Sequence, residues 1–194
     1  MRSRAYWIAG SMKGFWALAN TALVFCMVSV FQARGMEEAA AKHLTANTLT
    51  VFGITLALTH LPAGYLADKL PLNRILAFSA LCMGATFVIF TNMNDPLWHY
   101  PLGVCQGLSQ SLLLAVGATL WRRYYGRAHL GRIKGSMTTV MVGASAIGPF
   151  LVDGAHDLTG SYQSILLALS LMPIPLAIAS LLATPPKRAP ASAA

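Results

Sequence analysis

The sequence predicts an all-α, polytopic membrane protein with six transmembrane helices. Its 194 residues are 56% hydrophobic and only 10% charged, which is far less charge than a soluble domain of this length carries. The apolar residues fall into six stretches, each near the roughly 20 helical residues that cross a hydrocarbon core of about 30 Å. Helices are expected, because a bilayer offers no water to unpaired backbone groups and the alternation of barrel strands is not seen. The six spans are 14–31, 46–67, 75–91, 102–120, 136–152 and 165–182.

The basic residues predict the orientation of these spans. Of the 14 Lys and Arg residues, only Arg34 and Lys42 fall on one side, together with five of the six acids. An excess of Lys and Arg marks cytoplasmic loops, so both termini are expected in the cytoplasm. This placement at alternate helix ends also argues against nucleic-acid binding as the reason for the net charge of +8. The remaining basic residues, all on the predicted cytoplasmic side, are Arg2, Arg4, Lys13, Lys69, Arg74, Arg122, Arg123, Arg127, Arg132, Lys134, Lys187 and Arg188.

No composition break divides the chain, so one domain is expected over residues 1–184, followed by a disordered cytoplasmic tail over 185–194, which is rich in Pro and Ala. The stretch 36–43 is rich in Ala and Glu and is expected to extend the second helix outward. Small residues every four positions predict close helix packing, and Pro149 is expected to kink or weaken its helix. The small residues expected at helix contacts are Gly103, Gly107 and Ser111 on one helix and Gly135, Gly143 and Gly148 on the next.

The sequence contains no recognisable catalytic or metal-binding pattern. Cys26, Cys82 and Cys105 each lie inside a predicted span without the spacing of a metal site, and they are expected to fill the core. No Ser/His/Asp array, HExxH motif, P-loop or pair of membrane carboxylates is present. The prediction is therefore a protein that is not an enzyme and that needs no cofactor and no metal.

The cytoplasmic end of the second helix carries a motif. Gly64, Leu66, Ala67 and Asp68 match the signature G-x-L-A-D-R-x-G-R-R, with Lys69 in place of Arg, Pro71 in place of Gly and Arg74 as a displaced basic residue. The segment resembles the loop between the second and third helices of one half of a major facilitator superfamily transporter. The resemblance implies that Gly64, Asp68, Lys69 and Arg74 form a conformational latch that holds one half against the other and biases the outward-open state.

Two further segments resemble bacterial carriers of the monocarboxylate and oxalate type within this superfamily. Residues 124–135 read Y-Y-G-R-A-H-L-G-R-I-K-G, like the loop between helices 10 and 11, and Gly148-Pro149 followed by D-L-T-G-S-Y at 157–162 is like the passage from helix 11 to helix 12. Residues 2–7 also resemble the entry into helix 7. The resemblance implies that the chain is the C-terminal half, helices 7 to 12, of a transporter in the bacterial inner membrane, which is a plasma membrane.

Polar side chains inside the spans are the substrate-binding candidates, because they are costly in a membrane. Asn20, His60, Gln106 and Gln110 are these candidates, and no Asp, Glu, Lys or Arg lies away from the ends of the predicted spans. His60 stands four residues before Gly64, where many carriers of the monocarboxylate type place an arginine, and a histidine can pair with a carboxylate and titrate near neutral pH. The alternatives are a structural His60 bonded to a helix carbonyl freed by Pro62, and glutamines that bond helix to helix.

The resemblance implies a secondary active transporter, half-size, that works by alternating access on a small organic anion such as a monocarboxylate, with possible proton coupling. Six spans with both ends on one side fit halves related by an axis along the membrane normal. The expected partners are membrane lipid and a second six-helix half, either a copy of this chain or a separate N-terminal half. The alternatives are a membrane interaction subunit that transports nothing and a truncated remnant of a longer transporter.

Overall fold

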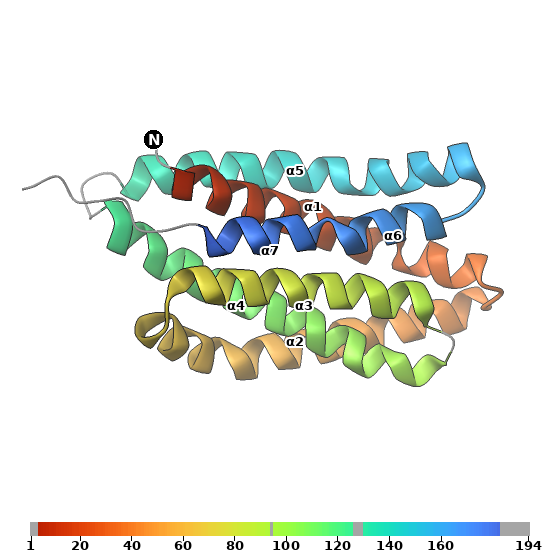
Figure 1. Cartoon of the computed structure of the whole chain (residues 1–194). Helices are drawn as coiled ribbons and strands as arrows, with labels where there is room; N and C mark the ends of the chain where they lie inside the picture. Colours follow the sequence, from red (N-terminus) through yellow and green to blue (C-terminus); the bar gives the residue numbers. More distant parts are fainter. Residues whose placement is uncertain (1–3, 94, 126–129, 183–194) are drawn as a thin grey trace, which may run out of the picture.

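The computed structural model describes residues 4–93, 95–125 and 130–182, and every regular element in them is helical (Figure 1). Six helical segments are long and apolar enough to span a membrane, so the all-α fold class with six transmembrane helices is confirmed. The predictions for Arg2, Arg127, Lys187, Arg188 and the tail 185–194 concern residues outside the described part of the chain. The elements are α1 (Arg4–Ala33), α2 (Glu38–Lys69), α3 (Leu72–Asn92), η1 (Pro96–Trp98), α4 (His99–Tyr125), α5 (Leu130–Thr159), α6 (Gln163–Leu171) and α7 (Pro173–Leu181).

The helices are longer than the predicted spans, because apolar windows locate only the hydrocarbon part of a helix. The first helix begins at Arg4 rather than at residue 14, and α5 runs on past residue 152 to Thr159 in spite of Pro149. As expected from 36–43, α2 begins outside its predicted span, at Glu38. The turn before it contains Gly35 at φ +89°, a backbone conformation that glycine adopts without strain.

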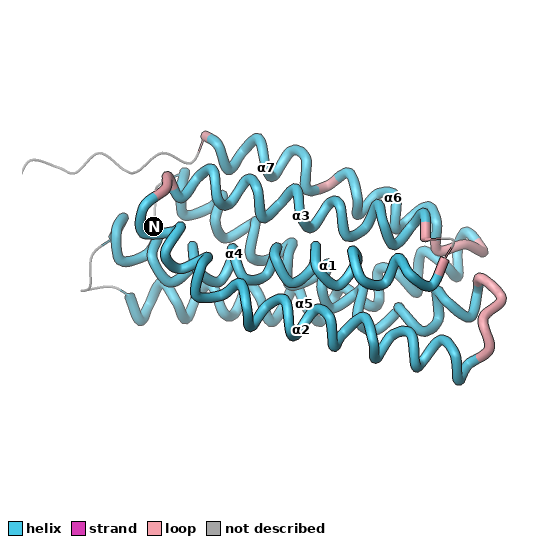
Figure 2. The backbone as a smooth tube through the Cα atoms, turned by 90° about the horizontal axis from the view of Figure 1, so that it is seen from below, coloured by secondary structure: helices cyan, strands magenta, loops and turns pink. Residues whose placement is uncertain are grey.

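The last predicted span, 165–182, is two helices rather than one. A turn at Met172 separates α6 from α7 (Figure 2), although the Met172 N–H still donates to the carbonyl oxygen of Ala168. Pro173 and Pro175 follow directly, and neither has the N–H that would bond to the carbonyl four residues earlier. The two short helices together still have the length and hydropathy of one span, residues 163–181.

Helices that are neighbours in the bundle are mostly not neighbours in the sequence (Figure 1). The first helix packs along α5, α2 packs along α4, and α3 packs against α4, α6 and α7. The largest fully buried side chains include Phe31 of α1, Phe87 and Phe90 of α3 and Trp121 of α4. The core is therefore built around α1, α3 and α4.

Two of the six spans are barely buried by the rest of the chain. Only 6% of the residues in the apolar window of α2 and 17% of those in α5 are buried, against 67% in α4. Each of the other four spans has a larger share of buried residues, from 33% to 67%. The exposed sides of α2 and α5 carry large apolar side chains, including Ile54, Leu58, Leu61, Val140, Val142, Ile147 and Phe150.

Two of the predicted small residues hold α4 against α2. A Cβ atom at Gly103 would lie 2.8 Å from the carbonyl oxygen of Thr48, and one at Gly107 would lie 2.9 Å from that of Phe52. Such distances leave no room for a side chain. Ser111, the third residue of this stripe, is buried, and its Oγ has no hydrogen-bond partner among the described residues.

On α5 only one of the predicted small residues packs against another helix. A Cβ atom at Gly148 would lie 2.3 Å from the carbonyl oxygen of Leu18 in α1, the tightest approach of any described glycine. A Cβ atom at Gly135 or Gly143 would meet nothing within 4 Å. Within the described chain these two glycines meet no other helix, because α5 instead places Met137 and Val140 opposite Gly10 and Gly14 of α1.

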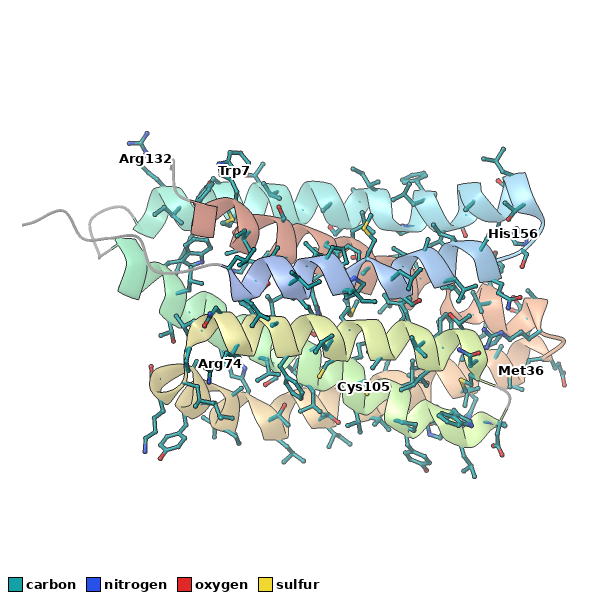
Figure 3. The ribbon with its side chains drawn as sticks, viewed as in Figure 1. Trp7, Met36, Arg74, Cys105, Arg132 and His156 are labelled. Carbon is teal, nitrogen blue, oxygen red and sulfur yellow. The ribbon has the colours of Figure 1, made fainter. Side chains whose placement is uncertain are left out.

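The two ends of the bundle differ in charge. Figure 3 shows Arg74 and Arg132 at one end, together with Trp7, and Met36 and His156 at the other. The basic end also holds the last turn of α2 with Lys69, and the opposite end holds Arg34 and Lys42. The separation agrees with the charge pattern used to predict the orientation.

Candidate functional site

Asn20 and Gln106 meet in the middle of the bundle. The amide nitrogen of Gln106 in α4 donates a hydrogen bond of 2.8 Å to the side-chain oxygen of Asn20 in α1. Gln106 is fully buried, and its own side-chain oxygen has no partner among the described residues. An amide pair away from water joins two helices, which is the helix-to-helix alternative considered for Gln106.

The next turn of α4 extends this polar contact to α3. The indole N–H of Trp16 in α1 donates to Ser109 Oγ at 3.2 Å, Ser109 Oγ donates to the carbonyl oxygen of Ser79, and Ser79 Oγ donates to the carbonyl oxygen of Ser109. Gln110, one residue on, is half-buried, and its side-chain oxygen also lacks a partner among the described residues. Three helices are thus tied together near the bundle centre.

A double-mutant cycle on Asn20 and Gln106 is expected to give a coupling energy of about 1 kcal/mol, the range found for hydrogen bonds between membrane helices. The variants are Asn20→Leu, Gln106→Leu and the double variant, and the measurement is reversible unfolding in mixed detergent and SDS. Each single variant leaves a buried amide unpaired. The double variant should therefore lose less unfolding free energy than the sum of the losses of the two single variants. A coupling energy of zero would contradict a formed amide pair.

His60 lies apart from the Asn20–Gln106 pair. It is on the exposed side of α2 and makes no hydrogen bond to the described residues, so the alternative bond to a carbonyl freed by Pro62 is not formed there. The structure therefore brings two of the four predicted candidates together and leaves His60 on the open face of the bundle.

The predicted latch residues lie at the basic end of α2. The helix ends at Lys69, where the N–H of Leu70 donates to the carbonyl oxygen of Leu66 at 2.8 Å, and the Lys69 ammonium lies 4.4 Å from the Tyr65 ring centroid. Asp68 and Arg74 are exposed, and a Cβ atom at Gly64 would meet nothing within 4 Å. The segment is therefore accessible to another surface. Residues 126–129 of the second motif lie outside the described part of the chain.

Lys13 is a charged residue inside the bundle that the sequence analysis placed at a span end. It lies in α1, half-buried, with its ammonium 5.9 Å from the Trp121 ring centroid of α4. The misplacement followed from starting the first span at residue 14. The apolar run over residues 5–12 was the available signal that the helix begins earlier.

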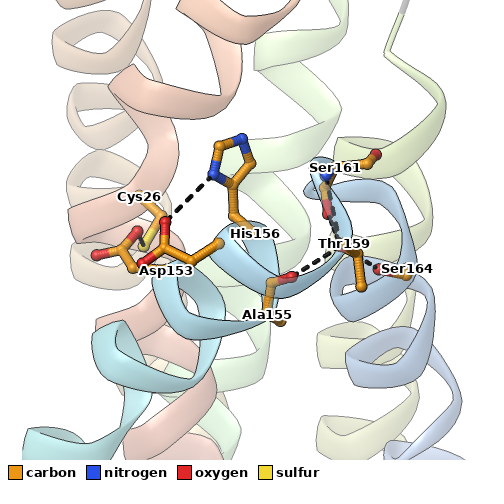
Figure 4. Close-up of polar contacts among 8 residues, drawn as sticks. Cys26, Asp153, Ala155, His156, Thr159, Ser161 and Ser164 are labelled. Carbon is orange, nitrogen blue, oxygen red and sulfur yellow. Dashed lines mark hydrogen bonds and ion pairs between the residues drawn. The ribbon is translucent and has the colours of Figure 1, made fainter.

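Asp153 is a second charged residue that the sequence analysis placed outside the spans. Because α5 continues to Thr159, Asp153 lies within the helix, where its carboxylate accepts a hydrogen bond of 3.5 Å from the Cys26 thiol of α1 (Figure 4). His156 stands 3.9 Å from Asp157 and stacks on Tyr162 with the ring centroids 4.1 Å apart. Burial raises the pKa of the Tyr162 phenol, and the negative charge of Asp153 adds to that rise.

A cavity of about 500 Å³ opens beside this group, with Arg34, Asp95, His156 and Tyr162 in its lining. The Arg34 guanidinium donates to the carbonyl oxygens of Phe90, Thr91 and Met93 at 2.7 to 3.2 Å. These are the last carbonyls of α3, so Arg34 caps that helix. Burial lowers the pKa of Arg34.

The polar groups described here are a buried amide pair, the Lys13 ammonium within α1 and the exposed polar groups at the two ends of the bundle. Among the described residues, no group of three His, Cys, Asp or Glu residues is placed to hold a metal ion. The sequence model of the Major Facilitator Superfamily matches residues 7–194. No curated protein and no solved structure gives a significant match. The chain is therefore an integral membrane protein that belongs to the Major Facilitator Superfamily, a family of membrane transporters and not of enzymes.

Proposed function

We propose that the chain is the C-terminal half of a secondary transporter, that it works by alternating access with a second six-helix unit, and that it carries a small organic anion such as a monocarboxylate. The observation that carries this proposal is the exposure of α2 and α5, because only 6% and 17% of the residues in their apolar windows are buried. Both helices lack a protein neighbour on much of their surface. A second half packed on them would cover that surface.

The character of the exposed surface supports a protein partner. Gly135 and Gly143 of α5 have open space where a side chain would lie, and small residues let another helix approach closely. His60 is on the exposed side of α2. In the proposed assembly His60 faces the substrate pathway between the two halves, and the partner is a copy of this chain or a separate N-terminal half.

The accessible end of α2 supports the proposed latch. Gly64, Asp68 and Lys69 lie in the last turns of α2, at the basic end of the bundle with Arg74. The excess of Lys and Arg at this end favours it as the cytoplasmic side. In the proposed cycle they contact the other half when the pathway is open to the outside. We place the protein in a bacterial inner membrane with both termini inside.

Native mass spectrometry of the protein, extracted gently from its own membrane into nanodiscs, tests the assembly. The expected result is a homodimer or a pair with another six-helix chain, because either one completes the pathway. A strict monomer would contradict the half-transporter mechanism and would favour an interaction subunit or a remnant of a longer transporter.

His60→Ala is expected to lower uptake of the substrate anion by about tenfold or more, because a hydrogen bond to a charged group contributes about 1.5 to 3 kcal/mol. The measurement is uptake of radiolabelled lactate and oxalate into proteoliposomes, normalised to the amount of protein in the membrane. The matched control is His43→Ala on the same helix, which removes an exposed histidine bonded to Asn47. Equal uptake by the two variants would contradict a role for His60.

A further inference from the structure

Lys13 lies deeper in the membrane than its place near the N-terminus suggests. It is nine residues beyond the first residue of α1, a helix of 30 residues. With a rise of 1.5 Å per residue the helix is roughly 45 Å long. A hydrocarbon core of about 30 Å centred on the helix then begins near the sixth residue of the helix, counted from Arg4. Lys13 then lies roughly 6 Å inside the hydrocarbon boundary.

The side chain of Lys13 is turned onto α4 and not back toward the membrane surface. Its Nζ lies 2.8 Å, and its Cε 3.0 Å, from the position that a Cβ atom would take at Gly117. Gly117 is eight residues before the end of α4 at Tyr125, which is roughly 12 Å from that end. The ammonium therefore stays at the depth of the Lys13 backbone, and the missing side chain of Gly117 provides its space.

The ammonium has no counter-charge in the described part of the chain. No ion pair and no hydrogen bond of Lys13 is formed with the described residues, and its contact is the Trp121 ring. The charge that acts on it is Lys134 of α5, another cation. Intramembrane charges are costly and almost always paired, so an ammonium that contacts only a ring is a candidate for binding an anion.

We propose that Lys13 binds the carboxylate of the transported anion at a site between α1 and α4, with Gly117 as the residue that leaves room for the lysine side chain. This inference rests on the proposed function and adds the cation that the sequence analysis did not find in the spans. A lysine is a compact charge with three donors, which fits a single carboxylate. Lys134 adds positive potential on the α5 side.

An anionic lipid headgroup offers the same negative charge to an ammonium near the cytoplasmic end, so the experiment separates the two sources. The protein is purified from its own membrane, with any partner that accompanies it, into nanodiscs of phosphatidylcholine alone or of phosphatidylcholine with phosphatidylglycerol. Equilibrium binding of radiolabelled L-lactate, acetate and oxalate is then measured for the wild type and for Lys13→Gln. The matched control is Lys42→Gln, which removes an exposed lysine paired with Glu38 at the opposite end.

In phosphatidylcholine discs, Lys13→Gln should raise the Kd of at least one of the three carboxylates by about tenfold or more, as expected when a charged hydrogen-bonding partner is removed. Lys42→Gln should bind as the wild type does, and Lys13→Arg should retain part of the affinity. A second variant, Gly117→Val, keeps the lysine but fills its space and should also weaken binding. Lys13→Gln should fold, because it removes an unpaired charge, and its thermal midpoint should equal or exceed that of the wild type.

Three results would overturn the inference: carboxylate binding unchanged in Lys13→Gln, no binding of any carboxylate by the wild type, or a Lys13 effect that occurs only with phosphatidylglycerol. Failure of the proposed function has a different signature, because it appears as a strict monomer with no uptake. A transporter that takes up lactate in a His60-dependent way, with full activity in Lys13→Gln, would retain the function and lose the Lys13 site.

Discussion

Gly148→Val is expected to lower the free energy of unfolding by about 3 kcal/mol, the upper part of the usual range for overpacking. The first atom of any side chain at this position would lie 2.3 Å from the Leu18 carbonyl oxygen and 3.1 Å from the Ala22 nitrogen of α1. Both atoms belong to the backbone of a helix and cannot rotate away. The two helices must separate, and the contact that joins α5 to α1 is weakened along its length.

The matched control for Gly148→Val is Gly143→Val on the same helix, where a new Cβ atom meets nothing within 4 Å. Both substitutions replace a helical glycine with valine, and because Gly148 also precedes Pro149, their difference contains the contact with α1 and the local clash with the proline ring. Unfolding is followed by tryptophan fluorescence during an SDS titration of the monomer in detergent, with the amount of protein in the membrane as a second measure. Equal stabilities of the two variants would mean that α1 and α5 are not in close contact at Gly148.

Gly107→Val is expected to lower the free energy of unfolding by about 2 kcal/mol through the contact between α2 and α4. A Cβ atom at Gly107 would lie 2.7 Å from the Cβ atom of Thr55 and 2.9 Å from the carbonyl oxygen of Phe52. Since α2 packs mainly along α4, the loss should be local to α2. Hydrogen exchange measured by mass spectrometry should then show faster exchange over 48–60 than over α3.

Gly53→Val is the control for the second substitution, because it places the same side chain on α2 where no atom lies within 4 Å. Its exchange should match that of the wild type within error. If Gly107→Val and Gly53→Val exchanged alike over 48–60, α2 would not depend on its close approach to α4.

The membrane fold was predictable because one physical requirement dominates it: each span needs a long apolar stretch. The six stretches, the outward extension of α2 and the contacts at Gly103, Gly107 and Gly148 all followed from local sequence. The break at Met172 was missed, although Pro173 and Pro175 were the signal for it. Gly135 and Gly143 have the same local pattern as Gly148, and only the packing of α5 on α1 distinguishes them.

Much less of the candidate site could be predicted, because it depends on where helices end and on which helices pair. Lys13 and Asp153 were placed outside the spans, since hydropathy gives the apolar window and not the full helix. The bond between Asn20 and Gln106 joins residues 86 positions apart, and no local pattern specifies such a pairing. His60 was identified as a candidate by its place before Gly64, and its exposure became visible only in the bundle.

The pairing of α1 with α5 has a consequence for how the chain is made. Tyr6 of α1 and Ser136 of α5 are hydrogen-bonded at 2.8 Å and are 130 residues apart in the sequence. A ribosome adding about 5 to 20 residues per second needs roughly 6 to 26 seconds to span that distance. During that interval α1 has already been synthesised, with Lys13 and Asn20, while the helices that contain Gly117, Gln106 and Gly148 are still to come. Until then the polar side chains of α1 lack the later helices that cover them in the finished bundle.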